Sequence, residues 1–97
     1  MLNSRQRAQL RGMANRMDAI FQIGKGGIGD QLIKQVEEAL EKRELIKLTV
    51  LETSPESVRF CADEVAKRSG ADVVQVIGSK FILYKESKEN KTIVLVK

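Results

Sequence analysis

Residues 24–29 read GKGGIG, and this stretch has the residue types and spacing best suited to ligand binding. Glycines let the backbone approach a phosphate without a Cβ clash, and amides at the start of a following helix point toward an anion. In one frame, Gly24, Gly26 and Gly29 satisfy G-x-G-x-x-G, the fingerprint of a dinucleotide site. In another, residues 24–27 form G-x-x-G, a loop that can clamp a nucleic-acid strand. A plain strand-to-helix turn is the third interpretation, although four glycines exceed what a turn requires.

The dinucleotide frame also needs a partner for the ribose, and Glu52 at the end of an expected strand could supply it. However, a dinucleotide is bound across two mononucleotide halves, and the pattern predicts only one strand–helix–strand unit before a small helix and a hairpin. An ATPase phosphate loop is excluded because no G-K-[ST] follows at the required spacing. The nucleic-acid frame requires no second half of the site. Gly24, Gly26 and Gly27 shape the contact, and Lys25 adds a mobile cation. We therefore favour it.

The positive charge is unevenly placed along the chain. Residues 1–29 carry five basic side chains and one acidic one, and residues 30–79 carry seven basic and ten acidic ones. Residues 80–97 carry five lysines and two glutamates. This segregation suggests a face directed at a polyanion, although a solvated helix face is the simpler alternative.

A helix expected at residues 4–16 supplies most of the positive charge at the start of the chain. Its candidate phosphate contacts are Arg5, Arg7, Arg11 and Arg16. Arg7 and Arg11 share one helix face and are the best pair. The arginine-rich stretch is also typical of a mitochondrial presequence, but its apolar stripe is needed to cover the core. Lys80, expected beside a hairpin turn, is a further candidate, and a solvated edge position is its alternative role.

The composition argues against an enzyme. Histidine is absent, which removes the commonest general base and the usual zinc ligand. The single cysteine, Cys61, cannot form an internal disulfide or a multi-cysteine metal site, and its place on an apolar helical stripe indicates packing. We expect no catalytic residue, no metal, no cofactor and no small-molecule substrate. The apolar runs are also too short to span a membrane.

Apolar periodicity and turn signals predict one α/β domain over residues 1–97, in the order α-β-α-β-α-β-β. The expected elements are a helix at 4–16 capped by Ser4, a strand at 18–23, a helix from Asp30, a strand at 45–52, a helix ending at Gly70, and two strands joined at Gly78-Ser79. The sheet should be mixed and four-stranded, with parallel strand–helix–strand crossovers and a final antiparallel hairpin. The tail, residues 87–97, is expected to add a short edge strand.

The few aromatic residues are assigned mainly to the core. Phe21, Phe60 and Phe81 are expected to be buried there, and Tyr84 could lie in the core or on the surface. Little material is then left for stacking bases, so recognition of RNA backbone and shape is better supported than sequence-specific readout.

Three stretches together resemble the CRM domain (chloroplast RNA splicing and ribosome maturation) in its stand-alone bacterial YhbY form: LNSRQRAQLRGMANRMDAIFQIGKGGI, ALEKRELIKLTVL and VIGSKFILYK. The resemblance runs from about Leu2 to Lys91. It implies a fold similar to the C-terminal domain of bacterial translation initiation factor three. It also implies RNA binding through the basic first helix and the G-x-x-G loop, and association with precursors of the large ribosomal subunit.

These observations lead to one hypothesis and two alternatives. The sequence is interpreted as a small, monomeric, non-enzymatic RNA-binding protein that assists large-subunit assembly in the cytoplasm. The first alternative is a protein-interaction adaptor that uses the acidic helix at residues 30–44 and binds no RNA. The second is a dinucleotide-binding fragment.

Overall fold

Helix α1 (Ser4–Ala14) is the first element of the computed structural model, which describes residues 2–97; Met1, the first residue of the predicted domain, lies outside them. Asn3 caps the helix and forms a capping box with Gln6: Asn3 Oδ1 accepts from the Gln6 amide at 2.8 Å, and Gln6 Oε1 accepts from the Asn3 amide at 3.0 Å. Ser4, the expected cap, is instead the first helical residue. The helix also ends two residues before the predicted end at position 16.

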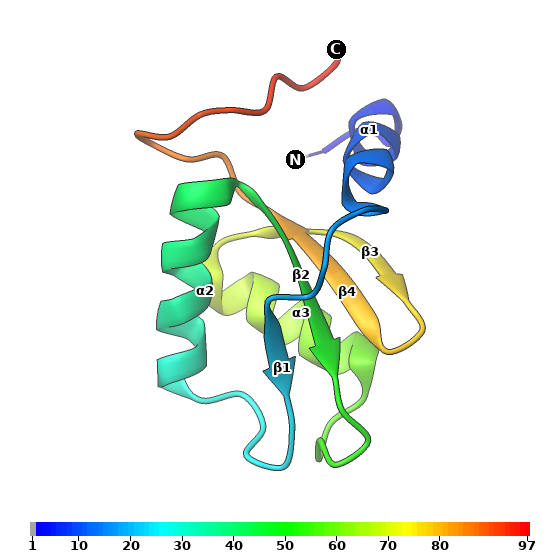
Figure 1. Ribbon diagram of the computed structural model, residues 1–97, viewed down its shortest axis with the longest axis vertical. Coiled ribbons are helices and arrows are strands. Elements are labelled where there is room, and N and C mark those ends of the chain that lie inside the picture. The colour runs from blue at the N-terminus through cyan, green and yellow to red at the C-terminus, as the bar shows by residue number, and fades with distance from the viewer. Residues whose placement is uncertain (1) are drawn as a thin grey trace.

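Four strands form one mixed sheet in the order β1-β2-β4-β3, as Figure 1 shows. Their bounds are β1 (Phe21–Ile23), β2 (Leu45–Val50), β3 (Asp72–Ile77) and β4 (Lys80–Tyr84). β1 and β2 run parallel, and β4 is antiparallel to both β2 and β3. The predicted α/β class, the element order and the mixed four-stranded sheet are confirmed, although β1 is shorter than the six residues expected.

Helices α2 (Asp30–Arg43) and α3 (Val58–Ser69) pack against one face of the sheet. Each buries one apolar stripe, with Val36 and Leu40 from α2 and Cys61 and Val65 from α3. Ser57 caps α3 through its side chain, and Gly70 ends it in the left-handed conformation with φ of 76°. The predicted stop at Gly70 and the buried position of Cys61 are confirmed.

One end of the opposite face of the sheet is covered by α1 and by the tail, which form a third layer there. Leu10 and Ala14 of α1 pack on Ile82 and Tyr84 of β4, and tail residues join this second core. The predicted turn at Gly78-Ser79 is also present, since Ile77 pairs with Lys80 and Gly78 has φ of 58°. No helix among residues 2–97 is long and apolar enough to cross a membrane.

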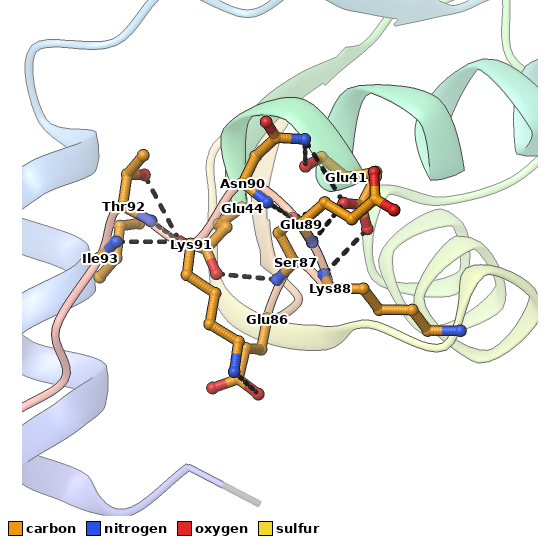
Figure 2. Close-up of polar contacts among 10 residues, drawn as sticks. All are labelled: Glu41, Glu44, Glu86, Ser87, Lys88, Glu89, Asn90, Lys91, Thr92 and Ile93. Carbon is orange, nitrogen blue, oxygen red and sulfur yellow. Dashed lines mark hydrogen bonds and ion pairs between the residues drawn. The ribbon is translucent and has the colours of Figure 1, made fainter.

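The tail, residues 87–97, is not the edge strand that the sequence suggested, because its amides bond to side chains rather than to a neighbouring strand. Figure 2 shows the amides of Ser87, Thr92 and Ile93 donating to the Glu44 carboxylate at 2.8, 2.7 and 2.9 Å. Glu41, one helical turn earlier, accepts from the Ser87 hydroxyl and from two further tail amides. Two carboxylates at the end of α2 thus fix the start of the tail.

Beyond Ile93 the tail is held by α1. The Gln9 side chain donates to the Val94 carbonyl and accepts from the Val96 amide, both at 2.8 Å. Gln6 donates to the Val96 carbonyl at 2.9 Å. The tail therefore connects the C-terminal end of α2 to the outer layer formed by α1.

Candidate nucleic-acid interface

Residues 24–27 form a closed turn directly after β1. The Gly27 amide donates to the Gly24 carbonyl oxygen at 2.9 Å, which leaves Lys25 and Gly26 at the two central positions, both exposed. Gly27 follows with φ of 68°, a backbone conformation that favours glycine. The turn therefore projects Lys25 and Gly26 into solvent at the end of the sheet.

Different structural constraints act on three glycines of this loop. A Cβ at Gly24 would lie 3.4 Å from both Leu51 Cδ1 and Thr53 Oγ1, so the neighbouring loop limits the space there. Gly27 needs its positive φ. Gly26 has neither constraint, because its φ is not positive and nothing lies within 4 Å of a Cβ built on it. The fold does not require glycine at this position, which is consistent with close approach of an external ligand.

The loop leads into the N-terminus of α2, where Gly29 occupies the cap position without a capping side chain. Asp30 in the first turn is paired with Arg68 of α3, with Arg68 Nη2 at 2.5 Å from Asp30 Oδ1. Arg68 Nη1 also donates to the Ile28 carbonyl oxygen at 3.4 Å. Arg68 thus fixes the end of the loop against α3 and offsets the negative charge of Asp30 beside the uncapped amides.

The predicted arginines differ in their contacts. Arg5 and Arg16 are exposed, and Arg11 is half-buried. Arg7 donates from Nη1 to the Val73 carbonyl oxygen of edge strand β3, so part of its donor capacity is used inside the protein. A role for all four arginines in RNA binding stays a prediction. At Arg7, a test of this role must distinguish lost RNA binding from loss of the bond to Val73.

A polar sheet surface lies between α1 and the loop. Lys47 and Thr49 of β2 alternate with the buried Ile46, Leu48 and Val50, so their side chains leave the sheet on the α1 side. Thr49 pairs with the predicted candidate Lys80 of β4, which is exposed. We call Lys47, Thr49 and Lys80 the sheet lysine surface. Lys47 was not singled out from the sequence, although a lysine at the outward position of an alternating strand could have revealed it.

The predicted residues do not converge on one pocket. In Figure 1, α1 lies toward one end of the long axis and the loop at residues 24–29 lies at the other end. The sheet lysine surface lies along β2 and the adjoining start of β4. On β2 it lies between Leu45, which packs under α1, and Leu51, whose amide donates to the Ile23 carbonyl oxygen next to the loop. The candidate residues therefore form an extended surface rather than a compact site.

The predicted packing of the phenylalanines in the core is confirmed at two positions and wrong at the third. Phe81 is fully buried and Phe21 packs against the core, but Phe60 is 46% exposed, so its predicted burial is wrong. Phe60 lies on the side of α3 that turns away from the sheet, because the core stripe of this helix runs through Val58, Cys61 and Val65. Tyr84, the ambiguous aromatic, is buried. Burial also raises the pKa of the Cys61 thiol, as expected for a packing residue.

The structure offers little to the dinucleotide interpretation. Among residues 2–97, β1 and β2 are the one hydrogen-bonded pair of strands that runs parallel, and both other pairs are antiparallel. Glu52 is exposed in the loop after β2. The described residues contain no cluster of side chains suited to a metal ion. A second mononucleotide half is therefore missing from this part of the chain.

Comparison with known proteins gives consistent matches over the whole domain. The profile of the CRS1 / YhbY (CRM) domain matches residues 2–85, which include every element from α1 to β4. A Bacillus subtilis (strain 168) protein named "Probable RNA-binding protein YqeI" is 50% identical, over 98% of this chain and 99% of its own length. A Haemophilus influenzae protein named "RNA-binding protein" is 29% identical, over 93% of this chain and 91% of its own. The solution structure of a hypothetical protein from Staphylococcus aureus is 46% identical, with a TM-score of 0.82 and coverage of 99% of this chain and 100% of that one.

Proposed function

Because this chain belongs to the CRS1 / YhbY (CRM) domain family, we propose that it is a non-catalytic RNA-binding protein. The observation that carries the proposal is the turn at residues 24–27, whose tip exposes Lys25 beside a glycine with open space around it. A phosphate can approach the Gly26 backbone directly, and the Lys25 ammonium can pair with it. The names of the relatives support RNA as the polyanion.

Binding of this kind recognises backbone and shape. The RNA strand runs from the loop along the sheet lysine surface toward the arginines of α1. This is an extended path on a molecule 39 Å long. Contacts to phosphates carry little sequence information, and each one adds to the salt dependence of the affinity. We expect the affinity for unrelated RNA sequences to fall steeply as salt rises.

The RNA partner we propose is large-subunit ribosomal RNA in pre-ribosomal particles, bound by a monomer in the cytoplasm. Support for this finer assignment comes from the family resemblance. Sedimentation of tagged protein with ribosomal particles, followed by cross-link mapping, tests it directly. Recovery at the top of the gradient, away from large-subunit precursors, contradicts the ribosomal assignment and leaves RNA binding itself unaffected.

The RNA-binding proposal is tested best at Gly26, because the fold tolerates a side chain there. Gly26→Glu places a negative charge where the phosphate approaches. Repulsion between two unit charges at 4 Å amounts to about 1 kcal/mol in water, so the affinity should fall at least roughly fivefold. Gly26→Gln adds the same bulk without charge, and its RNA affinity should fall less. Gln35→Glu makes the same charge change at an exposed position on α2 and should bind like the parent.

Fluorescence anisotropy with a single-stranded RNA at two salt concentrations measures these affinities. Melting temperatures confirm that each variant is folded. If Gly26→Glu is folded and binds as tightly as Gln35→Glu, the loop is not the contact. A protein-interaction adaptor would bind no RNA at either salt concentration.

A further inference from the structure

A cleft of about 290 Å³ lies between the loop at residues 24–29 and α3. The loop side is formed by Gly26, Gly27 and Ile28, and the other side by Pro55, Phe60 and Glu64. This volume is just below the lower end of the range for sites that bind drug-sized ligands, about 300 Å³. The cleft is therefore suited to one small group.

The side chains of α3 that face this cleft are four residues apart, at Phe60, Glu64 and Arg68, so they share one helix face. Arg68 is already paired with Asp30 and with the Ile28 carbonyl, and these contacts hold the loop against the helix. Phe60 is 46% exposed, and its ring has no place in the apolar core on the sheet side of α3. With Ile28 and Pro55 it supplies the apolar part of the cleft.

The charged groups in the cleft indicate the chemistry of its occupant. Glu56, Glu64 and Arg68 line it, and the charge of Arg68 is already paired with Asp30. The two carboxylates accept hydrogen bonds but cannot donate them. Two carboxylates repel a phosphate, so an RNA backbone on the loop tip would keep its phosphates outside the cleft. A neutral planar ring with N–H donors on its edge satisfies the apolar surface and the acceptors together.

We propose that this cleft holds one unpaired RNA base, stacked on Phe60, while the adjoining phosphate lies on the Gly26 backbone. Guanine fits best, because its Watson–Crick edge presents two adjacent N–H donors to the Glu64 carboxylate. Uracil has one N–H donor between two carbonyl oxygens that the carboxylate repels. The inference rests on the proposed RNA binding and adds a preference for single-stranded RNA with an accessible guanine.

The first test measures affinity for a uridine-rich single strand that carries one guanosine. Phe60→Leu keeps an apolar side chain but removes the aromatic face, and we expect the affinity to fall roughly fivefold or more at an unchanged melting temperature. Phe60→Tyr keeps the ring and should bind like the parent. A folded Phe60→Leu variant with parental affinity overturns the proposal. A parent protein that binds no RNA at all contradicts the proposed function instead.

The second test identifies the edge contact and needs no change in the protein core. Replacing the guanosine by inosine removes the exocyclic amino group, which should weaken binding to the parent several-fold and have less effect on Glu64→Gln. An equal loss in both proteins removes Glu64 from the contact. NMR of the parent gives an independent check, because a stacked base should shift the Phe60 ring protons upfield when RNA is added. Unshifted ring protons in saturated complex overturn the stacking even if Phe60→Leu does not fold.

Discussion

Replacing Glu44 by glutamine should remove the main attachment of the tail. Glu44 is fully buried although it is charged, and its Oε1 atom accepts from the Thr92 and Ile93 amides while Oε2 accepts from the Ser87 amide. Glutamine has the same length but only one acceptor oxygen. If that oxygen takes the Oε1 position, the new amide group faces the Ser87 amide, donor against donor.

The magnitude follows from these contacts. One hydrogen bond to a charged acceptor is lost, worth about 1.5–3 kcal/mol, and two others become weaker because the acceptor is neutral. We expect Glu44→Gln to lower the free energy of unfolding by about 3 kcal/mol. For a domain of this size that corresponds to a melting temperature lower by roughly 12–24 °C. Glu38→Gln, at an exposed position on the preceding helix α2, is the matched control and should have little effect.

The pH dependence gives a second measurement of the same effect. Burial by itself would raise the pKa of Glu44, but the backbone amides of Ser87, Thr92 and Ile93 outweigh it and hold the pKa below its ordinary value of 4.5. Hydrogen bonds from Ser87 and the tail amides similarly lower the pKa of Glu41 to about 2. Lowered carboxylate pKa values mean that this stabilisation is fully present above about pH 4.5 and is lost as pH falls toward 2.

Thermal unfolding followed by circular dichroism from pH 7 to pH 2.5 tests both the loss of stability and its pH dependence. The difference in melting temperature between the parent and Glu44→Gln should be large at pH 7 and should shrink as the pH falls. Equal melting temperatures at pH 7, or a difference that stays constant down to pH 2.5, would refute the reasoning.

Three further predictions concern the interface and the core. Arg7→Gln should reduce both RNA affinity and melting temperature because Arg7 also bonds to Val73, whereas Arg11→Gln should reduce affinity alone; anisotropy and thermal melts distinguish the two. Lys47→Gln should weaken binding to unrelated RNA sequences alike and flatten the dependence of log affinity on log salt by about one unit, and an unchanged slope removes the sheet from the interface. Cys61 should react slowly with a polar alkylating reagent in the native protein and quickly after denaturation, as mass spectrometry can follow; fast native labelling would contradict its burial.

The sequence predicted those parts of the fold that depend on local patterns. The stripe of α2, the stop at Gly70 and the hairpin at Gly78 each follow from residues close together in the chain. The sequence predicts the cap of α1 one position late, at Ser4, because Ser4 and Asn3 are both good capping residues. The reciprocal bond from Gln6 favours Asn3, and the spacing N-x-x-Q could have indicated it.

The parts that sequence analysis missed depend on contacts between distant segments. The tail has the β-branched residues of a strand, but its path is decided by Glu41 and Glu44, which lie more than forty residues earlier. The sequence predicts Phe60 in the core together with Phe21 and Phe81, whereas the phase of α3 puts Cys61 and Val65 there. In the candidate interface, the glycine positions follow from the sequence, but only the structure distinguishes Gly26, which has open space, from Gly27, which needs its positive φ.

The attachment of residues 94–96 to α1 also has a consequence for the order in which the domain folds during translation. α1 is synthesised before every other element of this domain, yet the partners of its Gln6 and Gln9 side chains lie 85 to 90 residues later in the chain. Its packing surface, on β2, β3 and β4, also appears only after most of the chain has been made. The arginine-bearing helix therefore remains undocked on a nascent chain while the β1-α2-β2 unit can already form. The complete extended surface is available only once the tail has closed over α1.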